Sequence, residues 1–304
     1  MTLIDNQTRF IVQGVTGNAA QWHLKEMLDL GQPVLAGIQP GGPREPVHGV
    51  PVFQSVAAAR EAIAEPPDAT LIFVPAAYAV DAAYEAIANR IPLLIWIAEG
   101  VPVHDTMRLV DYARGQGVRV VGPNTPGIIS PGRAKGGLMP SSAFSPGPVG
   151  MVSRSGTLSY ETALELTVRG IGQSTFIGVG GDPVRGTSIV EALTMLNGDA
   201  RTRAIVMIGE IGGNQEEVAA EFIAAEVRDK PVFALIVGEQ ARPGRRMGHA
   251  GAIMAGGVGA YRSKIAELER QGIEIAQSPA DLAERLTKVL SAATDAKTAH
   301  RQME

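Results

Sequence analysis

Short, continuous apolar runs alternate with helix-forming stretches along almost the whole chain, and this alternation limits the fold more than any other feature. The runs that we predict to be strands are 10–13, 34–38, 70–74, 93–97, 118–121, 149–152, 174–177, 204–208, 232–237 and 273–276. Runs that are apolar at every position are typical of parallel strands covered on both faces. Strands that alternate with helices form βαβ units, so the sequence predicts an α/β fold with doubly wound sheets.

The chain is long enough for more than one domain. Its 304 residues suggest about two domains. A stretch rich in proline, glycine and serine, 131–148, separates the two groups of strands. This composition is typical of loops, and we interpret the stretch as an ordered connector. The predicted domains are therefore residues 1–130 and 149–304.

The composition excludes several classes of protein. The net charge is −4, which gives no electrostatic case for binding to nucleic acid or to an anionic membrane. The chain has no cysteine, which excludes a disulfide framework, a thiolate metal site and a cysteine nucleophile, and we predict no metal site. Residues 1–9 are polar, and no apolar run approaches the roughly 18 residues of a membrane span. We therefore expect a cytoplasmic protein.

Residues 14–20 (GVTGNAA) follow the first predicted strand and precede a helix. Glycines permit a tight turn, and the free N–H groups of a helix N-terminus favour phosphate. The spacing is GxxG rather than GxGxxG, so a plain strand-to-helix turn is the alternative. No acidic residue closes the second strand, where residues 39–42 (QPGG) follow instead. This absence argues against an NAD-dependent oxidoreductase.

Residues 153–161 (SRSGTLSYE) follow another apolar strand and open a helix. The hydroxyl groups, Arg154 and the N–H groups of the helix N-terminus form a candidate cradle for phosphate or carboxylate. The alternative is that Ser155 or Thr157 only caps the helix, and capping is compatible with anion binding.

His249 lies in a glycine-bracketed segment, residues 246–253 (RMGHAGAI), with Arg245 and Arg246 just upstream. The small neighbours leave the imidazole accessible, and nearby cations and N–H groups favour an anion. This pattern fits a histidine that accepts and transfers a phosphoryl group. A histidine in an ordinary surface loop is the alternative.

Glu210 follows the predicted strand 204–208, at the edge where parallel sheets bind ligands. It is a candidate acceptor for the Nδ1–H of a histidine, which would leave Nε2 as the nucleophile. A solvated loop glutamate is the alternative. The loop 178–183 (GVGGDP) lies at the same edge, and we interpret it as a turn that lets backbones approach closely.

Four motifs, SRSGTLSYE, GVGGDP, MIGEIGG and RMGHAGAI, occur in this order between residues 153 and 253, as part of a resemblance that covers nearly the whole chain. Together they resemble the alpha subunit of the succinyl-CoA synthetase family, which includes malate–CoA ligase. The resemblance implies a Rossmann-like N-terminal domain that binds coenzyme A and a flavodoxin-like C-terminal domain with a phosphorylated histidine. It implies that His249 is phosphorylated and that Glu210 orients it. The residues implied to bind the phosphate or the acid substrate are Ser155, Gly156, Thr157 and Tyr160.

The same resemblance implies further ligands and a partner. A separate beta subunit with an ATP-grasp fold would bind ATP or GTP with Mg²⁺ and phosphorylate His249. The phosphohistidine would pass its phosphate to a small di- or tricarboxylic acid, and the thiol of coenzyme A would attack the acyl phosphate. The residues implied to contact coenzyme A are Thr16, Gly17, Asn18, Ala19, Ala20, Ile97, Ala98 and Glu99.

Three features depart from the family pattern. Gly42 stands where a lysine is usual, and Arg44 is the candidate replacement for its contact with coenzyme A. Thr125 stands where a cysteine is usual, and the loop 18–20 is less polar than its counterparts. Succinate, malate and citrate all remain candidate acids, since a few pocket contacts decide the substrate. A non-catalytic protein that binds coenzyme A for regulation is a further alternative.

Overall fold

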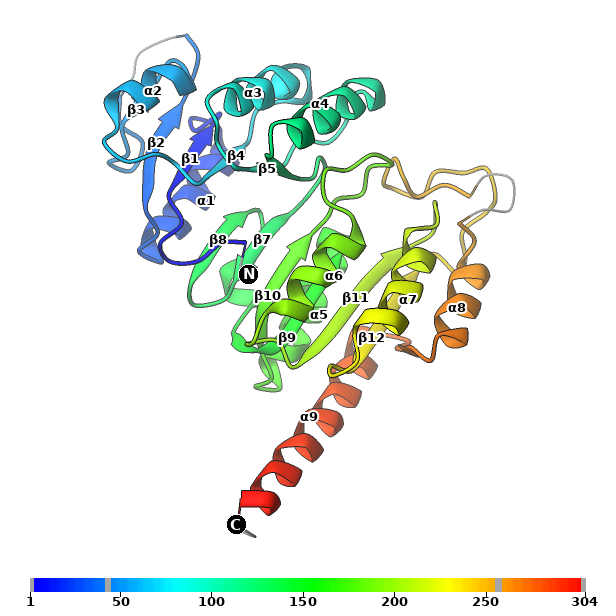
Figure 1. The fold of residues 1–304 in the computed structure, drawn as a ribbon. Helices are drawn as coiled ribbons and strands as arrows, with labels where there is room; N and C mark the ends of the chain where they lie inside the picture. Colours follow the sequence, from blue (N-terminus) through cyan, green and yellow to red (C-terminus); the bar gives the residue numbers. More distant parts are fainter. Residues whose placement is uncertain (1–2, 42–44, 255–258, 302–304) are drawn as a thin grey trace.

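The computed structural model describes residues 3–41, 45–254 and 259–301, with side chains described as far as residue 292. Within these ranges the chain forms two β-sheets, each flanked by helices (Figure 1). The α/β fold predicted from the alternating apolar runs is therefore confirmed.

Six strands of the described chain form the first sheet, in the order β3-β2-β1-β4-β5-β6, and all neighbours are parallel. These strands are β1 (Phe10–Gln13), β2 (Val34–Ile38), β3 (Val52–Phe53), β4 (Ala69–Ile72), β5 (Leu93–Trp96) and β6 (Arg119–Val121). The strand order reverses at β1, and open α/β sheets bind ligands at such a point, beyond the carboxyl ends of the strands.

Adjacent strand residues point to opposite faces of the first sheet, and on these strands most of them are apolar and buried. Both faces of the sheet are therefore covered by helices. Its helices are α1 (Asn18–Asp29), α2 (Val56–Ala62), α3 (Ala76–Ala88) and α4 (Val103–Gly115). Residues of α2, α3 and α4 pack with Ile11 and Leu94 in one apolar cluster. Leu24 of α1 belongs to a second cluster with Phe10 and Ile95, which precede Ile11 and follow Leu94 in their strands.

Seven strands of the described chain form the second sheet, in the order β13-β12-β11-β9-β10-β7-β8. These strands are β7 (Gly127–Ser130), β8 (Ala134–Gly137), β9 (Pro146–Ser153), β10 (Gln173–Gly178), β11 (Ala204–Glu210), β12 (Val232–Val237) and β13 (Glu274–Ile275). Strands β9 to β13 run parallel to one another. At one edge β7 pairs antiparallel with β10 and forms an antiparallel hairpin with β8.

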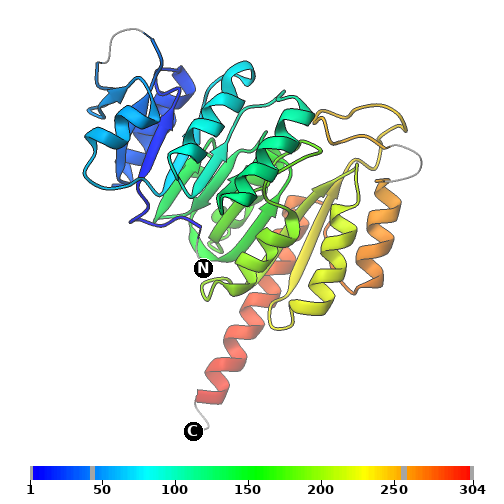
Figure 2. The same cartoon turned by 45° about the horizontal axis from the view of Figure 1, so that its top comes forward.

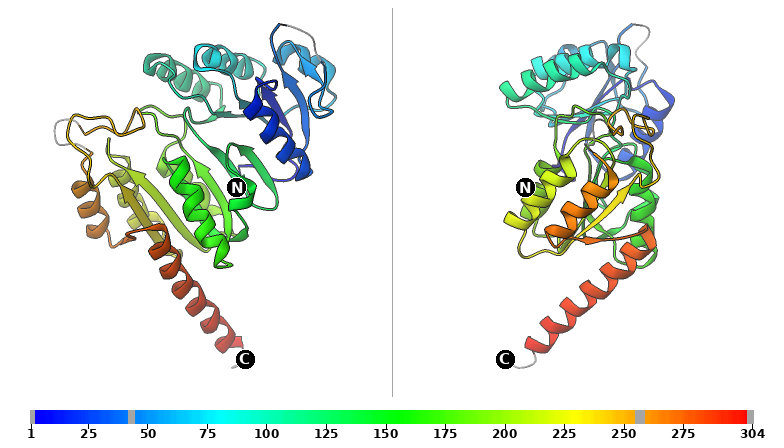
Figure 3. Two further views of the ribbon diagram at one scale, coloured as in Figure 1. Left: turned by 180° about the vertical axis from the view of Figure 1, so that it is seen from behind. Right: turned by 90° about the vertical axis from the view of Figure 1, so that its right-hand side faces the viewer.

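Five further α-helices surround the second sheet, as far as the chain is described. They are α5 (Gly156–Val168), α6 (Ile189–Gly198), α7 (Gln215–Glu226), α8 (Tyr261–Arg270) and α9 (Pro279–Arg301). The first half of α9 packs against α5 through Leu282 and Leu286, which are buried in the cluster beneath β9 and β11. The end of α9 projects away from the rest of the molecule (Figures 1 and 3).

The structure differs from the expected connector over 131–148. This stretch contains β8 and the first residues of β9, both of which belong to the second sheet. The four residues of β8 are buried although none carries a large apolar side chain, so the hydrophobic pattern does not reveal the strand. Glycines allow the pairing, because a side chain on Gly127 or Gly137 would overlap the opposite backbone.

The β7–β8 hairpin joins the two halves of the molecule. A side chain on Gly136 would be 2.7 Å from Ile95 and 3.2 Å from Phe10, so the hairpin packs directly on the first sheet. The buried Lys135 ion-pairs with Glu26 of α1. In Figures 1 and 2 the loop that follows β12 lies on the side of the second sheet that faces the first. Among the described residues, no helix has the length and apolarity needed to cross a membrane.

Candidate active site

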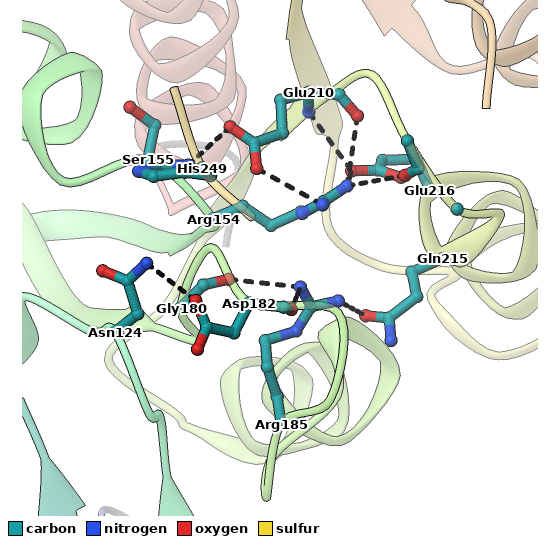
Figure 4. A network of polar contacts seen from close by, with 12 residues as sticks. Asn124, Arg154, Ser155, Gly180, Asp182, Arg185, Glu210, Gln215, Glu216 and His249 are labelled. Carbon is teal, nitrogen blue, oxygen red and sulfur yellow. Dashed lines mark hydrogen bonds and ion pairs between the residues drawn. The ribbon is translucent and has the colours of Figure 1, made fainter. Parts of the chain in front are cut away.

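The structure brings together the two residues on which the phosphoryl-transfer hypothesis depends. His249 lies in the loop between β12 and α8, and Glu210 is the last residue of β11. Nδ1 of His249 and Oε2 of Glu210 are 2.8 Å apart (Figure 4). The histidine side chain remains 29% exposed whereas the carboxylate is buried. The imidazole is therefore held from inside the protein and open to a ligand on its other side.

The hydrogen bond to Glu210 raises the pKa of His249 above its ordinary value, while burial and the charge of Arg154 act in the opposite direction. Because a carboxylate can only accept, we assign the proton of the neutral ring to Nδ1. The Nε2 lone pair is then available. This tautomer is the one that a nucleophilic histidine requires.

Glycines let three loops approach the histidine. An ideal Cβ on Gly181 would lie 2.6 Å from Nδ1 of His249, too close for any side chain. The N–H of Gly251 donates to the carbonyl of Gly181 at 3.0 Å. Gly212 has a φ of 95°, and a side chain there would overlap the carbonyl of Gly251. The interpretation of 178–183 as a turn for close backbone approach is thus confirmed.

The N-terminus of α5 provides a second component of the site. Ser155 is its N-cap and accepts a hydrogen bond from the N–H of Leu158 at 3.3 Å. In Figure 4 Ser155 lies at the same end of the polar network as the His249 ring. The N–H groups of Gly156 and Thr157, in the first turn, have no partner within the helix and can bind an anion. Tyr160 is exposed one turn further along.

Arg154 does not line this anion site, contrary to the expectation from its position in the motif. Its side chain is only 3% exposed and binds Glu210 and Glu216 inside the protein. Two carboxylates from β11 and α7 draw the guanidinium inward, and the sequence spacing does not reveal either partner. Arg245 and Arg246 are exposed in the histidine loop.

A cleft of about 790 Å³ opens at the carboxyl edge of the first sheet, a volume suited to a cofactor-sized ligand. Thr16 and Gly17 line it, together with Gln39 after β2 and Tyr78 of α3. Gly17 is the N-cap of α1, and no side chain caps this helix. The loop therefore leaves its helix N-terminus available for phosphate.

None of the other residues implied to bind coenzyme A is among the described residues that line this cleft. Asn18, Ala19 and Ala20 form the first turn of α1, and Ala20 is buried. Arg44, like Gly42, lies outside the described residues. The buried Thr125 hydroxyl donates to the carbonyl of Gly178 and accepts the N–H of Gly127, so it serves the turn before β7.

Residues 97–99 follow β5 and connect the first sheet to the histidine. They are not among the residues that line the cleft. The carbonyl of Ala98 accepts the N–H of Asn124 at 2.9 Å, and Ile97 donates to the carbonyl of Ile72. Glu99 lies near enough to His249 and Asp182 for its charge to raise the pKa of both.

Sequence reasoning missed Asn124 and Asp182. Asn124 has a φ of 54°, a conformation that asparagine tolerates better than most residues. Its Nδ2 donates to Asp182 Oδ1 at 2.8 Å, and its carbonyl accepts the N–H of Gly181 at 3.1 Å. Asn124 thus connects the loop after β5 to the glycine that packs against His249. Within the described residues, no group of three or more acidic or histidine side chains could hold a metal ion.

Two family models match the chain. A model described as a CoA binding domain matches residues 5–100, and one described as CoA-ligase matches residues 152–273. These ranges fall within the predicted domains 1–130 and 149–304, whose limits stay a prediction.

Similar proteins agree with both models. The alpha subunit of ADP-forming succinate–CoA ligase from Aquifex aeolicus is 48% identical, over 95% of this chain and 94% of that protein. Alpha subunit 2 of the ligase from Archaeoglobus fulgidus is 47% identical, over 95% and 99%. ATP citrate lyase from Methanothrix soehngenii, solved with citrate and coenzyme A, shares the fold with a TM-score of 0.86 at 23% identity. That match covers 96% of this chain, which spans about half (52%) of the lyase. The chain therefore belongs to the family of the succinate–CoA ligase alpha subunits.

Proposed function

We propose that this chain is the alpha subunit of a nucleoside-triphosphate-dependent succinate–CoA ligase. The proposed mechanism proceeds through a phosphohistidine and an acyl phosphate. The observation that carries the proposal is the 2.8 Å hydrogen bond between Glu210 and Nδ1 of His249. It leaves Nε2 free in a loop whose Gly251 lies against Arg154, the residue that precedes the N-cap of α5.

In the first step Nε2 of His249 attacks the terminal phosphorus of the triphosphate. The N–P bond forms, and the P–O bond to the nucleoside diphosphate breaks. The ring gains positive charge, which Glu210 stabilises through Nδ1–H. We assign the stabilisation of the phosphoryl oxygens to the N–H groups of Gly156 and Thr157 at the start of α5, with Ser155 as an additional contact.

In the second step a carboxylate oxygen of the acid attacks this phosphorus, and the N–P bond breaks to give an acyl phosphate and neutral His249. In the third step the sulfur of coenzyme A attacks the acyl carbon. The C–O bond breaks, inorganic phosphate leaves, and the thiol proton passes to solvent. No step uses a protein cysteine, which is consistent with the absence of cysteine from the sequence.

The proposal divides the ligands between two subunits. We assign coenzyme A to the cleft beside Thr16 and Gly17, with contacts from residues 18–20, 97–99 and Arg44, and the acid to the region of Tyr160. We assign ATP or GTP, with Mg²⁺, mainly to a beta subunit with an ATP-grasp fold. The names of the similar alpha subunits from Aquifex aeolicus and Archaeoglobus fulgidus support a separate partner subunit. A cytoplasmic location is part of the proposal.

Succinate is the acid that the names of these relatives indicate. Malate and citrate are alternatives, because the same transfer accepts any acid whose carboxylate reaches the phosphohistidine. The citrate lyase supports a shared fold and does not decide the acid. A regulatory protein without catalysis is poorly supported, since the hydrogen-bonded His249–Glu210 pair is complete.

The experiment that tests the proposal is labelling with γ-labelled ATP or GTP of the chain co-expressed with a beta subunit. We expect acid-labile label on the native chain and none on His249→Ala, with unchanged circular dichroism. His104→Ala removes an exposed histidine of α4 and should label like the native chain.

Succinate, malate or citrate is then added with coenzyme A. We expect succinate to discharge the label and to form a thioester. Thioester formation by His249→Ala at the native rate would disprove the mechanism. A folded complex that takes no label, beside an active control ligase, would favour the regulatory alternative.

A further inference from the structure

A buried network of charges lies behind Glu210, on the side away from His249 (Figure 4). Arg154, in the turn between β9 and α5, is at its centre. Its Nη2 is 3.3 Å from Glu210 Oε1, and its Nη1 is 2.9 Å from Glu216 Oε1. Nη1 also donates to the carbonyls of Glu210, at 3.2 Å, and Gly212, at 2.9 Å. One guanidinium therefore holds both the backbone and the carboxylate of Glu210.

The network continues into the helices that flank the sheet. The carboxylate of Glu216, from α7, accepts the backbone N–H of Glu210 at 3.2 Å and the Nζ of Lys264, from α8, at 2.7 Å. Glu216 and Lys264 have no exposed side-chain surface. Burial alone would raise the pKa of Glu216, but the charges of Arg154 and Lys264 outweigh it and keep this pKa low. Glu216 is therefore a fixed negative charge that shares Arg154 with Glu210.

Because Arg154 pairs with Glu210, it also affects the protonation of His249. Glu210 receives His249 on one oxygen and Arg154 on the other, so the two compete for the same carboxylate charge. The hydrogen bond from Glu210 raises the pKa of His249, and the charge of Arg154 lowers it. Other charges that act on this ring or near it are Glu99 after β5, and Asp182 with Arg185 after β10.

A histidine paired with an unopposed buried carboxylate would be held as imidazolium, which has no lone pair on Nε2. Buried ions are also costly, and apolar residues of similar volume would serve packing at least as well. The position of Arg154 behind the Glu210 carboxylate suggests another role for these buried charges. The cation limits how strongly Glu210 holds a proton on His249.

We propose that Arg154 is a positioning residue that acts through Glu210 to present His249 as a neutral nucleophile, protonated at Nδ1 and free at Nε2. Its importance for turnover rests on the proposed function. The protonation of His249 does not, and it can be measured on the full chain without a partner, nucleotide or acid.

The primary experiment is an NMR titration of the full chain with ¹⁵N-labelled histidine. The chain has five histidines, and the His249→Ala variant identifies the resonance of interest. We expect Arg154→Met to raise the pKa of His249 by about one unit, because Glu210 then acts unopposed. We expect Glu216→Gln to shift it in the opposite direction, because Arg154 is then no longer shared and one negative charge is lost.

Two further variants separate this role from a merely structural one. Arg154→Lys keeps the charge and should keep the pKa of His249 near the native value. Lys135→Met removes a buried, ion-paired cation at the α1–β8 contact and should leave the His249 resonance unchanged. If Arg154→Met does not fold, the opposite shift in Glu216→Gln and the native value in Arg154→Lys still test the proposal.

Chemical phosphorylation by phosphoramidate provides a second readout, because it needs neither a beta subunit nor ATP. At pH 7 we expect Arg154→Met to be up to about tenfold slower than the native chain, which is the loss of neutral imidazole for one pKa unit. A pKa in Glu216→Gln that stays native or moves upward would overturn the proposal, as would a native pKa in folded Arg154→Met. Failure of the ligase assay alone, with these shifts present, would contradict only the proposed function.

Discussion

Replacing Gly181 by alanine tests how closely the glycine loop after β10 holds the nucleophile. An ideal Cβ at this position lies 2.6 Å from Nδ1 and 2.7 Å from Cδ2 of His249. Favourable van der Waals contacts between a methyl carbon and ring atoms need about 3.5 Å, so the ring or the loop must move by about 1 Å. The hydrogen bond to Glu210 is 2.8 Å long, and a movement of this size would lengthen it to about 3.8 Å, beyond hydrogen-bonding range.

A misplacement of about 1 Å can cost about 10²-fold in rate, and we expect a loss of this size in the phosphorylation of His249. Binding of coenzyme A should be unchanged, because the proposed cleft lies on the first sheet. The assay is rapid-quench transfer of label from γ-labelled ATP to the alpha subunit in the complex with its beta subunit.

The matched control for Gly181→Ala is Gly115→Ala, at the end of α4, where an added Cβ meets nothing within 4 Å. This variant should label at the native rate. Labelling of Gly181→Ala within about twofold of the native rate would show that a displacement of about 1 Å does not slow phosphoryl transfer to His249. A change confined to the affinity for coenzyme A would show the same.

Three other predictions follow from the same geometry. Glu210→Gln should slow phosphorylation by about 10²-fold, as losing an orienting partner commonly does, and a native rate would remove Glu210 from the mechanism. Because Glu210 raises the pKa of His249, single-turnover phosphorylation should fall as the pH drops through this raised pKa, where imidazolium replaces the neutral ring. In Glu210→Gln this decline should move to lower pH, and a decline at unchanged pH would assign it to another group. Lys264→Met leaves the fully buried Glu216 without one of its two cations and should lower the free energy of unfolding by about 3–5 kcal/mol in urea titrations. A loss below about 1 kcal/mol would show that Arg154 suffices.

The strands illustrate where sequence patterns succeed. Buried parallel strands need apolar residues on both faces, and β1, β2 and β12 coincide with predicted runs. The β7–β8 hairpin was missed because β8 consists of alanine, lysine and glycines, which carry no hydrophobic signal. Its burial depends on the first sheet and on β10, neither of which is adjacent in sequence.

In the candidate site, too, some features are visible in the local sequence and others only in the fold. His249 and Glu210 stand out because small neighbours and strand ends are local features of the sequence. Their contact, across 39 positions, requires β11 and β12 to be neighbours in the second sheet. The position of Arg154 beside Ser155 predicts that it lines the anion site, and only the fold shows that its side chain turns to two buried carboxylates.

The sequence by itself determined the α/β class, most strand positions and the candidate nucleophile, because apolar periodicity and glycine spacing act over a few residues. The tertiary structure decided how that nucleophile is controlled. Burial makes the interactions among Glu210, Arg154 and Glu216 strong, since little water screens them. Which charges are buried together depends on how β9, β11, α7 and α8 pack, and no short stretch of sequence contains that information.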